Sequence, residues 1–331
     1  MQTYFSSFGY LSQIYGRPGE RPNLLRVLTY HRVGKPDEFP YLDPRQVSAT
    51  PAMFEQQMRF LAANYHVVHM EQVAEAVANG ARLPENAVAI TFDDAYRDVK
   101  DYAWPILKRC KLPATVFVPT AYPDQPQRTF WWDRLYNAFF NSALTELPAS
   151  PVGVLSLKTP EERLQNLKRL QNYLKSLSHN ESLGVIDETC RYLNGKSRDR
   201  SAVLGWEELR RLAKEGLTLG GHTRTHPILT QIPLSEVRRE VRGCLDDLKR
   251  EIGEILPVFA YPNGNHNREI IQIMKEEGYR LAFVTRGGFN NLDVQNPLTL
   301  QRINITRRTD LRVFRLRLQR WFSFIDMKRN A

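Results

Sequence analysis

Residues 87–94 of this 331-residue chain read Ala-Val-Ala-Ile-Thr-Phe-Asp-Asp, an apolar run that ends in two adjacent carboxylates. The run predicts a buried strand, because small, β-branched and aromatic side chains suit a sheet that is covered on both faces. Side chains alternate along an extended strand, so Asp93 and Asp94 can share one face only if the chain turns there. The stretch therefore predicts a strand that places acidic groups at one edge of a sheet.

A second polar stretch lies far downstream. Residues 217–221 read Leu-Thr-Leu-Gly-Gly, which again favours a strand, and His222 and His226 follow it. One carboxylate and two imidazoles are a ligand set that binds a divalent metal and leaves positions open for water and substrate. The second carboxylate is then free to accept a proton. Either stretch alone is more often a polar strand end or an unrelated histidine pair, but together they predict a centre for metal-assisted hydrolysis.

Short apolar segments alternate with helical patterns along most of the chain. Helices are expected at 54–62, 70–78, 236–252 after an N-cap at Ser235, and 268–278. Strands are expected at residues 24–30, 87–92, 115–118, 217–220, 258–261, 281–285 and 300–305. This alternation implies βα units and a mainly parallel sheet. We predict an α/β fold, a distorted (β/α)7 barrel, because the chemical residues follow many different strands and barrel active sites lie at the C-terminal strand ends. An open doubly wound sheet also fits.

The spacing between the third and fourth strands is too long for a normal crossover. Residues 121–204 hold an aromatic cluster at Trp131 and Trp132 and then a charged helical stretch, 161–177. We expect a largely helical insertion that is either a lid or packs on the outside of the barrel. The expected organisation is an N-terminal extension (1–23), a catalytic domain (24–306) that contains this insertion, and a C-terminal basic amphipathic helix (307–331).

Composition limits the partners and the cellular location that are expected for this protein. The net charge is +10, which favours anionic surroundings, but no nucleic-acid-binding motif is present and no nucleic-acid partner is expected. Cys110, Cys190 and Cys244 are scattered, which fits a reducing compartment. No signal peptide and no apolar run of the ~20 residues that span a bilayer is found, so a cytoplasmic location is expected.

The C-terminal segment is basic and amphipathic, and two interpretations of it are open. Arginines surround an apolar helical face made by Leu311, Phe314, Leu318, Trp321, Phe322 and Ile325. Such a helix can lie on anionic lipid, here the inner face of the membrane, which would suit a lipid-linked glycan or glycolipid substrate. It can equally be a terminal helix that packs on the barrel.

The two motifs together resemble the polysaccharide deacetylases (carbohydrate esterase family 4, the chitooligosaccharide deacetylase homology domain). Residues 91–94 resemble the first motif of that family, and 222–226, His-Thr-Arg-Thr-His, resemble the second. The segments 30–33 and 113–118 agree with it, and the resemblance extends from about residue 24 to 306 outside much of the insertion. It implies a hydrolase that removes an N-acetyl group from an amino sugar of a polysaccharide, an oligosaccharide or a lipid-linked glycan.

The resemblance also implies roles for individual residues. Asp93 is expected to be the general base. Asp94, His222 and His226 are expected to hold a divalent metal, zinc in the first place, with cobalt, nickel or iron as alternatives.

The chain departs from the family pattern at several positions. Ala95 stands where the first motif usually has glycine, and residues 260–264 lack the arginine of the third motif. We expect the backbone amide of Asn263 at the oxyanion position and Arg302 as the replacement arginine, although Arg302 could instead be a surface residue. The usual C-terminal acid histidine is absent. His31, which ends the first strand, is the expected acid, with His66, His69 and His266 as weaker candidates.

Two other functions remain open at this point. The same centre could serve an amidohydrolase or deformylase that acts on a non-polymeric amide. Alternatively, the chain could be a non-catalytic relative that binds glycan or membrane. A binding protein has no need of a spare carboxylate beside a metal triad, which argues for an enzyme.

Overall fold

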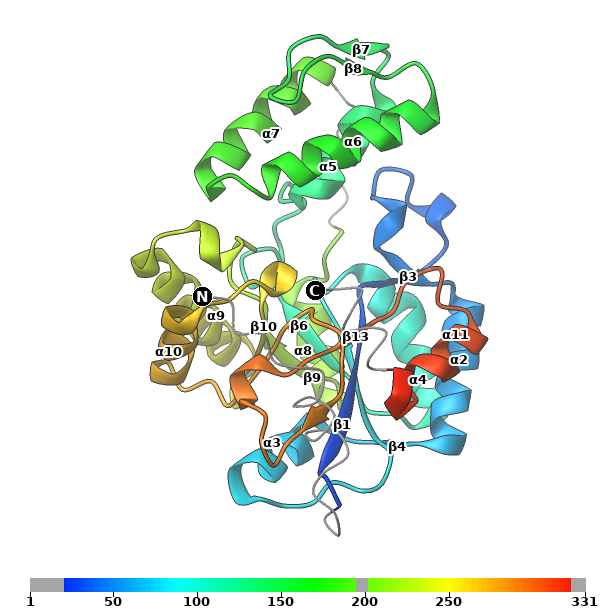
Figure 1. Ribbon diagram of the computed structural model, residues 1–331, viewed down its shortest axis with the longest axis vertical. Coiled ribbons are helices and arrows are strands. Elements are labelled where there is room, and N and C mark those ends of the chain that lie inside the picture. Colours follow the sequence, from blue (N-terminus) through cyan, green and yellow to red (C-terminus); the bar gives the residue numbers. More distant parts are fainter. Residues whose placement is uncertain (1–20, 195–201, 323–331) are drawn as a thin grey trace.

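The computed structural model describes residues 21–194 and 202–322. Parallel strands curl into a barrel in the order β1, β5, β6, β9, β10, β11, and β13 pairs with β1 (Figure 1). Leu300, just before β13, bridges to Phe283 of β11 and closes the circle. The strands are β1 (Leu24–Tyr30), β5 (Ala87–Phe92), β6 (Thr115–Val118), β9 (Thr218–Gly221), β10 (Val258–Ala260), β11 (Leu281–Phe283) and β13 (Ile303–Asn304). The predicted distorted (β/α)7 barrel is therefore confirmed.

Helices cover the outside of this barrel. They are α2 (Pro51–Asn64), α3 (Met70–Asn79), α4 (Trp104–Cys110, after a π-helical turn at Val99–Ala103), α8 (Trp206–Lys214), α9 (Leu234–Ile252) and α10 (Arg268–Glu276). Each turns an apolar stripe inward, as amphipathic helices on a sheet do. Helix α9 begins after Pro233, so the predicted N-cap at Ser235 is wrong, because the rigid proline fixes the start of the helix two residues earlier.

Several very short strands were not expected. They are β2 (Arg32–Val33), β3 (Val47–Ala49), β4 (His66–Val67) and β12 (Asn290–Asn291). β4 pairs with the beginning of β5, and β12 runs antiparallel to the beginning of β1. β2 and β3 pair with each other in a separate two-stranded sheet, so none of the four changes the strand order of the barrel.

The insertion forms a compact unit above the C-terminal strand ends, at the top of Figure 1. Its elements are α5 (Trp131–Asn141), β7 (Glu146–Leu147), β8 (Leu155–Ser156), α6 (Pro160–Leu174) and α7 (His179–Leu193). We call residues 131–193 the cap. The cap has an apolar core of its own, which includes Leu135, Phe139, Leu167, Leu170, Leu174 and Ile186. Its position is that of a lid, and the antiparallel β7–β8 pair adds a small sheet to the predicted helices.

The C-terminal segment packs on the barrel as far as the structure describes it. Helix α11 (Leu311–Arg317) lies against α2, and Phe314 and Leu318 are buried, with Phe314 in edge contact with Phe60. Two residues of the apolar face, Phe314 and Leu318, are therefore used inside the molecule, as the interpretation of a terminal helix packed on the barrel expects, whereas Trp321 is exposed. Ile325 and the rest of the tail, like residues 1–20, lie outside the described residues. None of the described helices has the length and hydrophobicity to cross a bilayer.

Candidate active site

The chain turns sharply where β5 ends. Asp94 and Ala95 both have left-handed backbone angles, with φ of 71° and 51°. Neighbouring side chains on a straight strand would point to opposite faces. This turn instead brings Asp93 and Asp94 to the same end of the barrel, where both are buried. A left-handed conformation costs a residue with a β-carbon roughly 1 kcal/mol, so Ala95 stores strain where the family usually has glycine.

Three ligand atoms meet beside this turn. Oδ1 of Asp94 lies 3.3 Å from Nε2 of His226 and 3.5 Å from Nε2 of His222, and the two imidazole nitrogens are 3.2 Å apart. Ligands at about 2.0–2.1 Å from a tetrahedral zinc ion would lie roughly 3.4 Å from one another. Oδ1 of Asp94 is buried and makes no hydrogen bond to any described residue. The set therefore fits a divalent metal, and it is the cluster that the sequence predicted.

The two histidines are held by their surroundings. Nδ1 of His222 lies 2.6 Å from the carbonyl oxygen of Ala260, which orients Nε2 toward Asp94, as a neighbouring carbonyl does for metal-binding histidines. Burial lowers the pKa of His222 to about 4, although the nearby Asp93 opposes this. The ring is therefore neutral at physiological pH, as a metal ligand must be. His226 packs edge-on against Trp132, with ring centroids 5.0 Å apart.

Asp93 is paired with an arginine. Nη1 and Nη2 of Arg302 donate to Oδ1 and Oδ2 of Asp93 at 2.7 and 2.8 Å. Arg302 is 0% exposed, so the alternative of a surface arginine is wrong. Burial by itself would raise the pKa of Asp93, but Arg302 and His222 outweigh it and hold that pKa well below its ordinary value. The arginine that is missing from residues 260–264 is thus supplied from the segment before β13.

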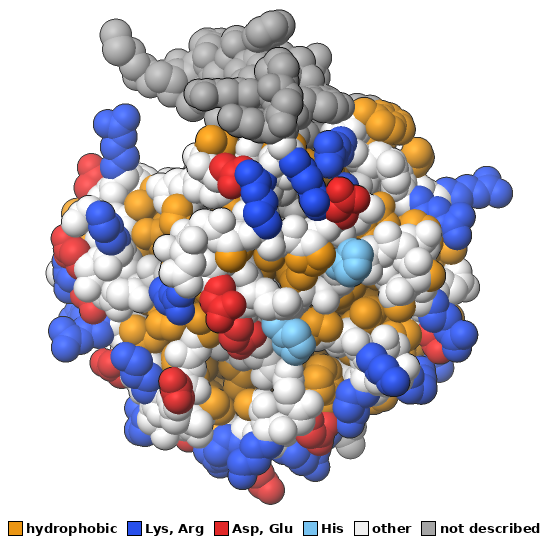
Figure 2. All heavy atoms as spheres, turned by 90° about the horizontal axis from the view of Figure 1, so that it is seen from below, with side chains coloured by type: hydrophobic (Ala, Val, Ile, Leu, Met, Phe, Trp, Pro, Cys, Tyr) orange, Lys and Arg blue, Asp and Glu red, His pale blue; other side chains and the backbone are white. Residues whose placement is uncertain are grey.

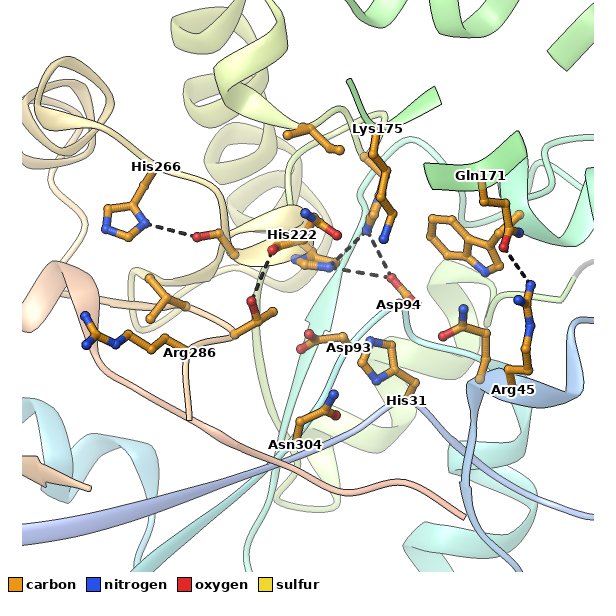
Figure 3. A pocket seen from close by; sticks show the side chains of 18 of the residues that line it. His31, Arg45, Asp93, Asp94, Gln171, Lys175, His222, His266, Arg286 and Asn304 are labelled. Carbon is orange, nitrogen blue, oxygen red and sulfur yellow. Dashed lines mark hydrogen bonds and ion pairs between the residues drawn. The ribbon is translucent and has the colours of Figure 1, made fainter. Parts of the chain in front are cut away.

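A cavity of about 870 Å³ opens above these groups, between the barrel and the cap (Figure 3). His31 lies on its barrel side, close to the two aspartates. Its backbone N–H donates to Oγ of Ser48 at 2.9 Å, which anchors the position just after β1. Of the weaker candidates, His266 lines the cavity, whereas His66 and His69 do not. His66 pairs with Ala87 at the N-terminal end of β5, and His69 follows shortly after it, whereas the site lies at the C-terminal end of that strand.

Asn263 lines the same cavity from a tight turn after β10. Its φ is 56°, and its carbonyl accepts a hydrogen bond from Oγ1 of Thr285 at 3.1 Å. Gly264 follows with a φ of 77°, and a β-carbon there would lie only 2.6 Å from the backbone nitrogen of Thr285. The turn that positions Asn263 therefore requires glycine at the next residue.

The cap supplies cavity residues that sequence reasoning missed. They are Lys168, Gln171, Asn172 and Lys175. Trp131 of the aromatic cluster in the sequence also lines the cavity. The four α6-face residues follow the i, i+3, i+4, i+7 spacing of one helix face. That spacing is visible in the sequence, but it does not say which way the face points. Trp132 also lines the cavity, although it is only 8% exposed, and it packs against His226.

The family is settled by comparison with known proteins. The polysaccharide deacetylase family model matches residues 80–282, which contain Asp94, His222 and His226. The chain belongs to this family, and it is a hydrolase of the class that cleaves amide C–N bonds. It is similar to the putative polysaccharide deacetylase YxkH of Bacillus subtilis, with 19% identity over 288 residues, 87% of this chain and 73% of that protein.

Two further similarities are informative. The chain is 34% identical over 85 residues to the poly-beta-1,6-N-acetyl-D-glucosamine N-deacetylase of Escherichia coli K12, but this covers 25% of the chain and only 13% of that enzyme. The structure resembles the Streptococcus pyogenes deacetylase PplD in complex with acetate, with a TM-score of 0.61 and 19% identity, over 90% of this chain and 100% of that one. At this identity the structural likeness establishes the fold.

Proposed function

We propose that this protein is a metal-dependent N-deacetylase that removes the acetyl group from an amino sugar within a glycan. The observation that carries the proposal is the convergence of Asp94, His222 and His226 next to a second carboxylate that is held by an arginine. The similarity to a poly-N-acetylglucosamine N-deacetylase supports the substrate class. Zinc suits the donor set of one carboxylate and two imidazoles best, although other divalent metals bind such sets.

The residues around the cluster divide the work of amide hydrolysis. When bound, a divalent cation supplies Lewis-acid chemistry, polarising the amide carbonyl and making water more acidic. Asp93 then accepts the proton of the attacking water, and Arg302 keeps this carboxylate ionised and correctly oriented. The backbone N–H of Asn263 donates to the oxyanion that develops on the carbonyl oxygen.

The departing amine requires a proton before the C–N bond can break. We assign this step to His31, which lines the cavity beside both aspartates. Proton donation to the nitrogen leaves acetate and the free amino sugar as products. His31 and Asp93 directly follow the neighbouring strands β1 and β5, and both line the cavity.

The proposal is tested by acetate release from N-acetylglucosamine oligomers. Metal-stripped protein is assayed alone and with zinc, cobalt or nickel restored, and bound metal is measured by elemental analysis. We expect metal-dependent release that falls by about 10²–10⁴-fold in Asp93→Asn, the usual cost of losing a general base. Asp93→Asn should keep stoichiometric metal, whereas His222→Ala should lose it. Metal-independent release, or full activity in Asp93→Asn, contradicts the proposal.

A further inference from the structure

One face of α6 is polar and faces the cavity. Lys168, Gln171, Asn172 and Lys175 line it, while Leu167, Leu170 and Leu174 on the other side are buried in the core of the cap. Residues at this spacing share one helix face, so the apolar side that anchors α6 also determines which side chains reach the cavity. The helix therefore presents two ammonium groups to whatever lies above the metal cluster.

These two ammonium groups have no counterion within the part of the chain that the structure describes. No carboxylate in residues 21–194 or 202–322 lies within 4.0 Å of Nζ of Lys168 or Lys175. Their neighbour Arg45 differs, because it is paired with Asp43 and donates to Oε1 of Gln171 at 2.7 Å. The pKa of Lys175 lies below its ordinary value, because surrounding atoms desolvate the ammonium and Arg45 is nearby. The two lysines therefore line this side of the cavity without a carboxylate partner of their own.

A third cation lies across the cavity. Arg286 follows β11 and lines the cavity on the side away from Gln171 and Arg45 (Figure 3). It too has no carboxylate within 4.0 Å among the described residues. The face opposite the cap is different, since basic and acidic side chains are interspersed there (Figure 2). The overall positive charge of the protein is therefore not the reason for the unbalanced charge in the cavity.

The acidic groups of the cavity are already engaged. Of the described residues that line it, only Asp93 and Asp94 are acidic. Asp93 is neutralised by Arg302, and Asp94 belongs to the metal cluster. A ligand that enters therefore meets a positive field, which favours anions and speeds their association. A volume of about 870 Å³ is near the upper end of the roughly 300–1,000 Å³ of ligand pockets, so a charged group fits beside the reacting sugar.

We propose that Lys168 and Lys175, with Arg286 opposite, form a subsite for a negatively charged group of the substrate, a carboxylate or a phosphate close to the amino sugar that is deacetylated. This inference rests on the proposed function, since it specifies the substrate class of the same site. The substrate is then an acidic glycan or a sugar phosphate, in contrast to a neutral polymer of N-acetylglucosamine. Asn172, which is exposed between the lysines, is available to bind a hydroxyl group of the same ligand.

The test compares three substrates of similar length. They are a neutral N-acetylglucosamine tetramer, an alternating N-acetylglucosamine–glucuronate tetramer, and an N-acetylglucosamine oligomer with a 1-phosphate. The quantity measured is the ratio of kcat/KM for each charged substrate to that for the neutral one. We expect one of the two charged substrates to be preferred at least about tenfold, with the preferred one identifying carboxylate or phosphate, and the preference to weaken as NaCl rises.

The variants are Lys168→Gln combined with Lys175→Gln, and Arg169→Gln as the matched control. Arg169 is an exposed cation on the same helix that does not line the cavity. The double variant should lose about tenfold of the preference, and the control should keep it. Equal use of neutral and charged substrates by the wild type, or an unchanged ratio in the double variant, overturns the inference.

A binding measurement separates failure of this inference from failure of the proposed function. The same three oligosaccharides are titrated calorimetrically into the metal-loaded wild type and the double variant. If no substrate is deacetylated but the charged ones bind the wild type more tightly, the proposed reaction is wrong and the subsite stands. If the neutral tetramer is hydrolysed but the charged oligosaccharides bind no better, the reaction stands and the subsite is wrong.

Discussion

The barrel side of the cavity carries a buried pair of opposite charges, Asp93 and Arg302, whereas the cap side carries exposed lysines without a carboxylate partner among the described residues. Asp93 is 2% exposed and Arg302 0%, and each satisfies the other. Lys168 and Lys175 are exposed on one helix face. Buried pairs demand exact partners and tolerate little change, while exposed side chains can change at small cost to the fold. The proposed catalytic residues thus lie in the barrel, where substitutions are costly to stability, and the proposed substrate-selecting lysines lie on the cap, where they are tolerated.

Breaking the buried pair on the barrel side should have the largest effect on stability. Arg302→Gln leaves the carboxylate of Asp93 buried without a cation, and removal of one partner of such a pair costs about 3–5 kcal/mol. We expect the free energy of unfolding in urea to fall by this amount and the deacetylase activity to fall with it. If Arg302→Gln unfolds at the same urea concentration as the wild type, the pair does not stabilise the barrel.

Arg302→Lys separates the effect of charge from that of geometry, because lysine keeps the positive charge but cannot contact both oxygens of Asp93 in the same way. We expect a smaller loss of stability than in Arg302→Gln. Equal losses in the two variants would mean that the shape of the guanidinium, and not its charge, is what holds Asp93.

The junction between the two regions should respond to pH. Asp133 of α5 accepts a hydrogen bond from the hydroxyl of Tyr96 at 2.7 Å and from the backbone N–H of Asp43 at 2.7 Å. Burial raises the pKa of Asp133 to about 7, against about 3.9 for an aspartate in an unfolded chain. Between these two pKa values the folded state holds a proton that the unfolded state has lost. The contribution of this group to stability is therefore fully present below about pH 4 and is lost as the pH rises toward 7.

Asp133→Asn mimics the protonated side chain and should remove this dependence. Between pH 5 and 7 we expect the free energy of unfolding of the wild type to fall relative to Asp133→Asn by on the order of 2 kcal/mol. Urea unfolding at several pH values measures the difference. Asp246→Asn, on the exposed surface of α9, is the control and should follow the wild type. Parallel pH profiles for Asp133→Asn and the wild type would mean that Asp133 is already ionised at pH 5.

The smallest effect is expected at the strained turn beside the metal cluster. Ala95→Gly removes the β-carbon from a left-handed residue, and the strain relieved is partly offset by the lost burial of a methyl group. We expect a gain in stability of less than about 1 kcal/mol and activity within about twofold of the wild type. Equilibrium denaturation and initial rates test this. A loss of more than about 1 kcal/mol would show that packing of the methyl group outweighs its strain.

The early strands were predicted to the residue, and the later ones less well. β1, β5 and β6 have the expected bounds, because long buried runs of apolar residues carry a strong signal. β10 and β11 end one or two residues before their predicted ends, since their last residues belong to the loops that line the site. β7 and β8 have two residues each, which is too short for any periodic pattern.

By itself, the sequence predicted the barrel class and the set of Asp94, His222 and His226, because motif chemistry and strand periodicity are local properties, and the resemblance to a known family suggested the residues around that set. Only the tertiary structure decided that Arg302, 209 residues from Asp93, contacts it, and that α6 turns Lys168 and Lys175 toward the cavity. Both facts depend on how distant segments are rotated against one another. Packing of the whole chain sets that rotation, and no local pattern encodes it.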